Sequence, residues 1–172
     1  MKILGIDPGS RITGYGIIEN TGNSISHVDN GGIQPDHKLP FSQRLRKIFD
    51  ELANLIDIHK PDIVAIENVF VAKNVRSSLL LGHARGTAMV AASLANLRVE
   101  EYSPSEVKQA IVGTGRATKC QIQHMVKAML NLPEIAFEDA SDALAVAICH
   151  CNTASFKNRL QKQQLINKRR DK

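Results

Sequence analysis

The sequence predicts a single α/β domain built on a mixed β-sheet with helices on both faces. Three strand-like segments separated by turn residues open the chain, helix-like and strand-like segments then alternate, and helices follow. With 172 residues, 43% of them hydrophobic, the chain is long enough to enclose a sizeable core. We expect residues 1–154 to form this domain and residues 155–172 to form a flexible basic tail.

The first half of the chain predicts an antiparallel meander followed by a helix. Strand candidates at Lys2–Asp7, Gly14–Glu19 and Ile25–Ile33 are separated by segments rich in Pro, Gly, Asn and Thr. The hydrophobic period then changes from Phe41 to His59, where apolar residues recur at i, i+3, i+4 and i+7. This spacing predicts an amphipathic helix, which Pro61 ends.

The second half alternates strands and helices. Strands are predicted at Asp62–Glu67 and Arg98–Tyr102, and a long Ala- and Leu-rich helix is predicted at Ser77–Leu97. The remaining elements are a short helix from Ser103-Pro104 up to Gly113-Thr114-Gly115, an amphipathic helix around Ile122–Leu130, and a last helix at Asp139–Cys149.

Composition and charge point to a cytoplasmic protein that handles phosphates. No apolar run approaches the roughly 20 residues that cross a bilayer, and the N-terminus does not resemble a signal peptide. The chain has a net charge of +5, but the tail alone, with seven Lys or Arg and one acid, carries +6, so residues 1–154 carry −1. Within the body, residues 68–132 hold eight Lys or Arg and three Glu, whereas residues 133–154 hold four acids and no Lys or Arg. A basic stretch beside an acidic pocket suits binding of phosphates and cations.

The three cysteines do not predict a disulfide framework or a zinc site. Their number is odd and their spacing irregular. Cys149 and Cys151 flank His150, but neighbours one and two apart on a helix point in different directions. Ordinary thiols fit this pattern better than zinc ligands.

Four carboxylates form the candidate active site. Asp7 and Glu67 each end a predicted strand, and ligands gather beyond the carboxyl ends of strands in open α/β sheets. Asp139 and Asp142 are spaced i, i+3 before an apolar helical stretch, so they share one helical face. Any one of these acids alone could be a turn or capping residue. Their joint pattern favours a site, and at the third position Asp139 ranks above Glu138.

Crowded carboxylates indicate a metal site. They repel one another, and divalent cations relieve that repulsion. Oxygen-only ligands favour Mg²⁺ or Mn²⁺ over zinc. Two such ions roughly 3.5–4 Å apart would activate water and stabilise the departing oxygen of a phosphodiester. The residues therefore predict phosphoryl transfer to water.

Five motifs resemble the RuvC family of Holliday-junction resolvases. They are GIDPGSRITGYGII around Asp7, IVAIENVFVAKN around Glu67, EDASDALAVAICH around Asp139 and Asp142, and, between these, LLLGHARGTAMVAA and VKQAIVGTGRATKCQIQHMV. The resemblance covers about residues 1–154. It implies a ribonuclease H-like fold with a mixed five-stranded sheet.

The resemblance also implies an activity and partners. A member of this family resolves four-way DNA junctions by paired symmetric nicks in recombination and repair, as a homodimer with two Mg²⁺ in each active site, where Mn²⁺ can substitute. It cooperates with the branch-migration proteins RuvA and RuvB. A twofold dimer also matches the approximate twofold symmetry of a four-way junction. Leu79, Leu80, Ala84 and Ala88 could belong either to the dimer face or to the core.

Basic and aromatic residues near the acids are candidate DNA contacts. Phe70 could stack on an unpaired base or plug the core, and the resemblance favours stacking. The basic positions could instead form only solvated faces, but Gly-rich backbone beside lysine can approach phosphates. The resemblance assigns Lys108 and Lys119 to the junction site. The basic candidates are Lys73, Arg76, Lys108, Arg116 and Lys119.

Three other functions compete with this interpretation. Gly5-Ile6-Asp7-Pro8-Gly9 is similar to the first phosphate loop of actin- and hexokinase-like ATP-binding proteins, but a second Gly-rich loop is not evident. An inactive DNA-binding module would not need all four acids. A nuclease of RNA–DNA hybrids would share the carboxylates, and only a comparison of substrates separates it from a junction nuclease.

Overall fold

The protein forms a five-stranded mixed sheet with the order β3-β2-β1-β4-β5. The computed structural model describes residues 1–22, 24–68 and 75–153. Strands β1, β2 and β3 pair antiparallel, whereas β4 and β5 join β1 as parallel strands, so both the predicted meander and the mixed sheet are confirmed. The strands span β1 Lys2–Asp7, β2 Thr13–Asn20, β3 Ile25–Ile33, β4 Ile63–Glu67 and β5 Arg98–Tyr102.

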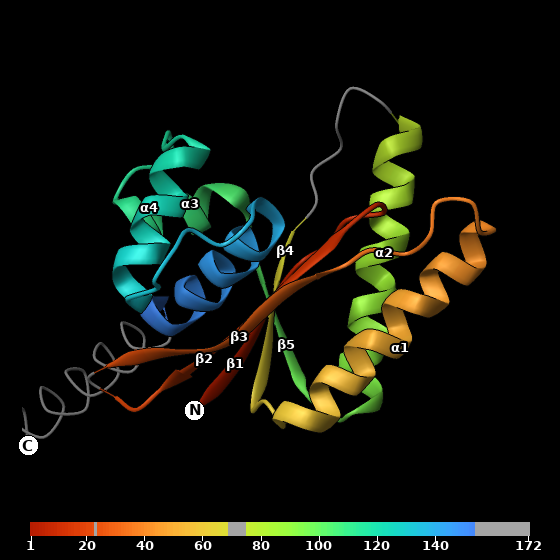
Figure 1. Ribbon diagram of the computed structural model, residues 1–172, viewed down its shortest axis with the longest axis horizontal. Helices are drawn as coiled ribbons and strands as arrows, with labels where there is room; N and C mark the ends of the chain where they lie inside the picture. The colour runs from red at the N-terminus through yellow and green to blue at the C-terminus, as the bar shows by residue number, and fades with distance from the viewer. Residues whose placement is uncertain (23, 69–74, 154–172) are drawn as a thin grey trace, which may run out of the picture.

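Helices cover both faces of the sheet (Figure 1). On one face lie α1 (Phe41–His59) and α2 (Val75–Leu94), which pack against each other. On the other face lie α3 (Pro104–Val112), α4 (Lys119–Leu130) and a last helix over residues 138–153.

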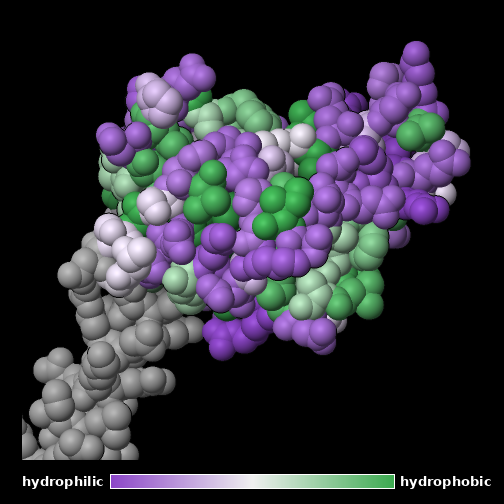
Figure 2. Space-filling model, turned by 60° about the horizontal axis from the view of Figure 1, so that its bottom comes forward, coloured by the Kyte–Doolittle hydropathy of each residue, from purple (hydrophilic) through white to green (hydrophobic). Residues whose placement is uncertain are grey.

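Each face of the sheet has its own hydrophobic core. Alternate strand residues point to opposite faces, so Leu4 and Ile6 pack towards α1 and α2, while Ile3 packs with the last helix. The last helix is almost wholly buried from Ala140 to Cys151. The surface drawn in Figure 2 is mostly hydrophilic, and its hydrophobic side chains form small separate groups. Within the described residues, no helix combines the length and the apolar character needed to cross a membrane.

Local capping fixes the two helices that carry the candidate lysines. Ser103 caps α3 and forms a reciprocal capping box with Glu106. Thr118 caps α4 in the same way with Gln121. Lys119 is therefore the first residue of a helix whose start is defined by two reciprocal hydrogen bonds.

Some observed boundaries differ from the predicted ones: strand β4 begins at Ile63 and not at Asp62, and helix α2 begins at Val75 and not at Ser77. Helix α2 ends at Leu94, not Leu97, because Asn96 adopts a left-handed conformation with φ of 56° that ends the helix. Strand β2 spans one more residue at each end than predicted. The last helix begins at residue 138 and extends to 153, so Glu138 lies in its first turn.

Candidate active site

Parallel pairing of β1 and β4 brings the two strand-end acids together. Ile6 pairs with Ile66 in the register, so the next residues, Asp7 and Glu67, leave the sheet side by side. The Asp7 and Glu67 side chains lie within hydrogen-bonding range of each other and line the same cleft. The structure therefore brings together the two acids that the sequence places at strand ends.

Two glycines let the last helix approach the sheet closely. A Cβ atom added to Gly14 would lie 2.0 Å from the carbonyl oxygen of Asp139, and one added to Gly5 would lie 2.1 Å from that of Ala143. Gly14 is the register partner of Asp7 on β2. The start of the last helix is therefore pressed onto the sheet beside Asp7, which brings Asp139 and Asp142 to the strand-end acids.

Burial and mutual repulsion raise the pKa values of three of these carboxyl groups. Burial, followed by the charges of Glu67, Asp142 and Asp139, raises the pKa of Asp7 to about 8. Burial also raises the pKa of Glu67 above its usual range, although the hydrogen bond from Asp7 opposes this shift. The pKa of Asp142 is raised chiefly by burial, against the opposing charge of Lys119. The charge of Asp139 also contributes to the raised pKa values of Asp7 and Asp142.

Two lysines share a cleft with three of the acids. Asp7, Glu67 and Asp142 line a cleft of about 320 Å³ together with Lys108 and Lys119. The Nζ atom of Lys119 lies 3.5 Å from Asp142 Oδ2. It also forms an ion pair with Glu138. The charges of both lysines oppose the burial that raises the pKa of Glu67.

The carboxylates suit a hard divalent cation by their chemistry. The donors are oxygen only, and a bound cation would offset the repulsion that contributes to the raised pKa of Asp7. Among the residues that the structure describes, however, no three Asp, Glu, His or Cys side chains are grouped closely enough to hold one ion.

The other candidate DNA contacts lie around the cleft or beyond the described residues. Phe70 and Lys73 fall outside the described residues. Arg76 is exposed in the first turn of α2, and Arg116 is exposed in the segment between α3 and α4. Neither of these arginines lines the cleft.

The zinc interpretation of the last helix gains no support. Cys149 and Cys151 are buried free thiols. His150 is also buried, and its Nδ1 forms a hydrogen bond of 2.7 Å with the Tyr102 hydroxyl. These residues hold the last helix against β5.

Sequence reasoning missed the glycines that set the height of the last helix above the sheet. Gly5 lies in β1 and Gly14 lies in the neighbouring strand β2. A glycine inside a strand can mark the close approach of another backbone. That signal was present in the sequence. It could not have shown which backbone approaches.

Comparisons with known proteins agree with this geometry. Residues 3–150 match the family model described as crossover junction endodeoxyribonuclease RuvC. The protein of that name from Geotalea uraniireducens is 55% identical over 168 residues, covering 98% of each chain, and the one from Geobacter sulfurreducens is 57% identical, covering 94% of this chain and 98% of that protein. The structure of T. thermophilus RuvC in complex with a Holliday junction substrate superimposes with a TM-score of 0.87 and 30% identity, covering 91% of this chain and 96% of that one. The chain therefore belongs to the RuvC family of crossover junction endodeoxyribonucleases.

Proposed function

We propose that this protein nicks four-way DNA junctions by hydrolysing phosphodiester bonds at the carboxylate cleft. One observation carries the proposal: Asp7, Glu67 and Asp142 line a single cleft, and Asp139 lies within their electrostatic field. Family membership supplies the substrate class, because the T. thermophilus relative is described in complex with a Holliday junction substrate.

We infer that the four carboxylates hold Mg²⁺, with two ions in each site and Mn²⁺ as a substitute. Bound cations would supply an activated water and neutralise charge on the phosphate. The protein's own contribution is positional. The β1–β4 pair presents Asp7 and Glu67 from a rigid sheet edge, and the buried last helix presents Asp139 and Asp142.

The two cleft lysines are suited to the phosphate. Lys108 and Lys119 lie among the acids, where an ammonium group can bind a phosphate oxygen and stabilise charge that develops in the transition state. Arg76 is exposed at the start of α2 and Arg116 is exposed between α3 and α4, where they could bind phosphates farther along the DNA. For Phe70 and Lys73 the resemblance alone supports a role in DNA binding.

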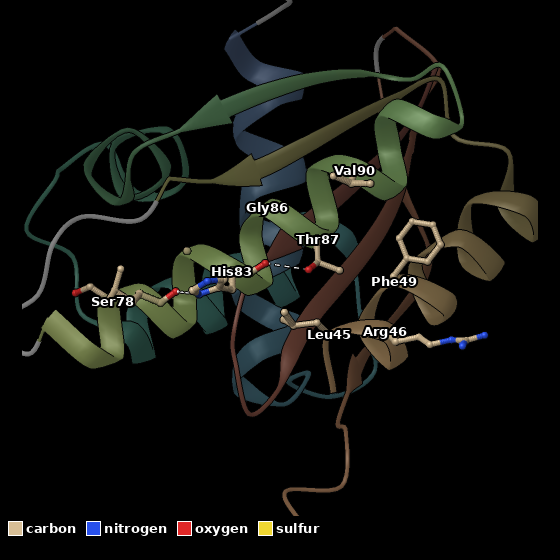
Figure 3. A pocket seen from close by; sticks show the side chains of 10 residues that line it. Leu45, Arg46, Phe49, Ser78, His83, Gly86, Thr87 and Val90 are labelled. Carbon is tan, nitrogen blue, oxygen red and sulfur yellow. Dashed lines mark hydrogen bonds between the residues drawn. The ribbon is translucent and has the colours of Figure 1, made fainter. Parts of the chain in front are cut away.

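Paired symmetric nicks need two active sites, and we infer that a second copy of this chain supplies the other one. A groove of about 700 Å³ runs between α1 and α2 (Figure 3). Gly82 and Gly86 leave open space along its α2 side, while Leu79 and Val90 are 59% and 51% exposed. In Figure 3 the α2 residues of this groove face Leu45 and Phe49 on α1.

The exposed face of α2 fits a self-complementary interface. Helix α2 buries Ala84, Ala88, Ala91 and Ala92 against the sheet, and it also exposes Leu79, Val90 and Leu94. Large apolar side chains that lie exposed near one another often mark a surface that another protein covers. A twofold axis beside α2 would let two copies cover each other and would match the symmetry of the junction.

The decisive experiment compares substrates of equal sequence. With Mg²⁺ present, the protein should nick a four-way junction and leave linear duplex and RNA–DNA hybrid largely intact. Preferential cutting of the hybrid would identify a different nuclease, and tight ATP binding would favour the phosphate-loop alternative. From the family resemblance we also infer a cytoplasmic location. We further infer cooperation with RuvA and RuvB, and co-purification of these two proteins with this protein on a bound junction would test it.

A further inference from the structure

Phe137 is an exposed aromatic residue beside the active site. It directly precedes the last helix and lies two residues before Asp139. Its side chain is 49% exposed. The ring lies over Gly32 of β3, because a Cβ atom on Gly32 would be 2.7 Å from Phe137 Cζ and 3.0 Å from Ile12 Cγ2.

The register of the sheet relates Phe137 to the catalytic acids. Gly32 pairs with Gly14, and Gly14 pairs with Asp7, so these three residues form one row across the sheet. Paired residues point to the same face. With strands about 4.8 Å apart, Phe137 lies over the row roughly 10 Å from the Asp7 backbone.

Phe137 lies on the opposite flank of the acids from Lys108. On the β5 side, Glu67 pairs with Tyr102, and the helix that follows Tyr102 carries Lys108. On the β3 side the row ends under Phe137 and Ile12. The cleft therefore has a basic flank and an apolar flank.

A purely structural role accounts for only part of this arrangement. A ring that served only to fill space over Gly32 would be expected to be buried, whereas half of this side chain faces solvent. Phe137 belongs to neither hydrophobic core. Contact with the backbone of β3 holds the ring in place, which is a property of a preorganised binding surface.

We propose that Phe137 and Ile12 form an apolar shelf that contacts the sugar and base face of a DNA nucleotide near the cut phosphate. The proposal rests on the proposed function, because it assigns part of the junction-binding surface. At a rise of about 3.4 Å per nucleotide, roughly 10 Å from Asp7 corresponds to about three nucleotides from the scissile phosphate.

An apolar contact differs from a phosphate contact in its salt dependence. A Lys or Arg that neutralises a phosphate releases counterions, so losing it reduces the slope of log affinity against log salt by about 0.9. Loss of an aromatic contact weakens binding without changing that slope. An aromatic contact to one base corresponds to about a tenfold or larger change in affinity.

The test measures affinity for a four-way junction in EDTA, where cleavage is suppressed, over a range of NaCl concentrations. Phe137→Ala should bind about tenfold more weakly with the slope of the unmodified protein. Phe137→Trp should retain affinity. Because the chain contains no tryptophan, the emission of that indole should change when the junction binds. Ile58→Ala is the matched control, since Ile58 is 62% exposed on α1, away from the cleft.

Several outcomes would overturn the shelf without touching the nuclease assignment. Unchanged affinity of Phe137→Ala would do so, as would a reduced salt slope, which would point to a charged neighbour. If Phe137→Ala unfolds, the folded Phe137→Trp variant decides the question. Tryptophan fluorescence that does not change when this variant is saturated with junction would overturn the proposal. Failure of the unmodified protein to bind or nick the junction would instead reject the proposed function itself.

Discussion

At the scale of single residues, the crowded acids of the site repel one another, and this repulsion lowers the free energy of unfolding when they are ionised. Asp7 is half-buried, near Glu67, Asp142 and Asp139, and its pKa rises to about 8. The folded protein therefore binds this proton more tightly than the unfolded chain does. The resulting contribution to stability is complete below about pH 4 and is lost as the pH rises through 8.

Replacing Asp7 by Asn should remove both the destabilisation that ionised Asp7 causes at high pH and the nicking activity. In EDTA at pH 8.5 we expect Asp7→Asn to raise the free energy of unfolding by on the order of 2 kcal/mol, with little effect at pH 4. The same variant should bind four-way junctions but not nick them in Mg²⁺. Urea unfolding at both pH values and a nicking assay check the two parts. If the free energy of unfolding depended on pH equally in the variant and the unmodified protein, Asp7 would not be the group with the raised pKa.

The two ion pairs of Lys119 should differ in their importance. The pair with Glu138 is exposed on both sides, at 64% and 59%, and such pairs contribute little. Asp142 is only 25% exposed at its pair with the same lysine and lines the cleft. Glu138→Ala should therefore keep the nicking rate within about twofold, whereas Lys119→Ala should reduce it at least tenfold. A larger loss for Glu138→Ala in single-turnover kinetics would make Glu138, not Asp139, the stronger candidate for the third position.

At the scale of secondary structure elements, the sequence was most informative where one local signal decides the outcome. Strand β3, helix α1 and strand β5 have the predicted bounds, because hydrophobic period and turn residues agree there. The convergence of Asp7 and Glu67 was also predictable, since both end apolar strands. Positions that depend on tertiary contact were not predictable in the same way. The ion pairs of Lys119 and the backbone contact at Gly14 join segments far apart in the chain.

The contact between Gly14 and the last helix predicts a sharp effect of one methyl group. A Cβ at position 14 would lie 2.0 Å from the Asp139 carbonyl oxygen, so Gly14→Ala must push the helix away from Asp7. We expect a loss of about 1–3 kcal/mol in stability. We also expect a fall of at least tenfold in the nicking rate, with metal-free junction affinity nearly unchanged.

Gly115→Ala serves as the stability control for this variant. A Cβ at Gly115 meets no atom closer than 3.9 Å, and its backbone does not require glycine. Urea unfolding should show little or no loss for Gly115→Ala. If Gly14→Ala were as stable and as active as the unmodified protein, close contact of helix and sheet would not be what positions Asp139.

At the scale of the whole molecule, the carboxylate cleft and the groove proposed for dimerisation lie on different faces of the sheet. The carboxylate cleft opens at the carboxyl ends of β1 and β4, near the helices of one face, whereas the apolar groove lies between α1 and α2 on the other face. A second copy could therefore cover the groove and leave the cleft accessible to DNA. Two such clefts related by a twofold axis would present one active site to each of two opposed strands.

A charge in the groove should uncouple the two nicks. Gly86 lines the groove, and its position leaves open space, so Gly86→Arg is compatible with the fold of one copy but places charge in the apolar interface. We expect sedimentation velocity to show a dimer for the unmodified protein and a monomer for the variant. On a supercoiled plasmid with an extruded cruciform, the dimer should give linear product, whereas the variant should give mainly singly nicked circles at a reduced rate. Ile58→Arg, which adds the same charge to an exposed apolar site on α1 outside the groove, should remain dimeric and linearise the plasmid. A Gly86→Arg protein that stays dimeric and still makes paired cuts would place the interface elsewhere.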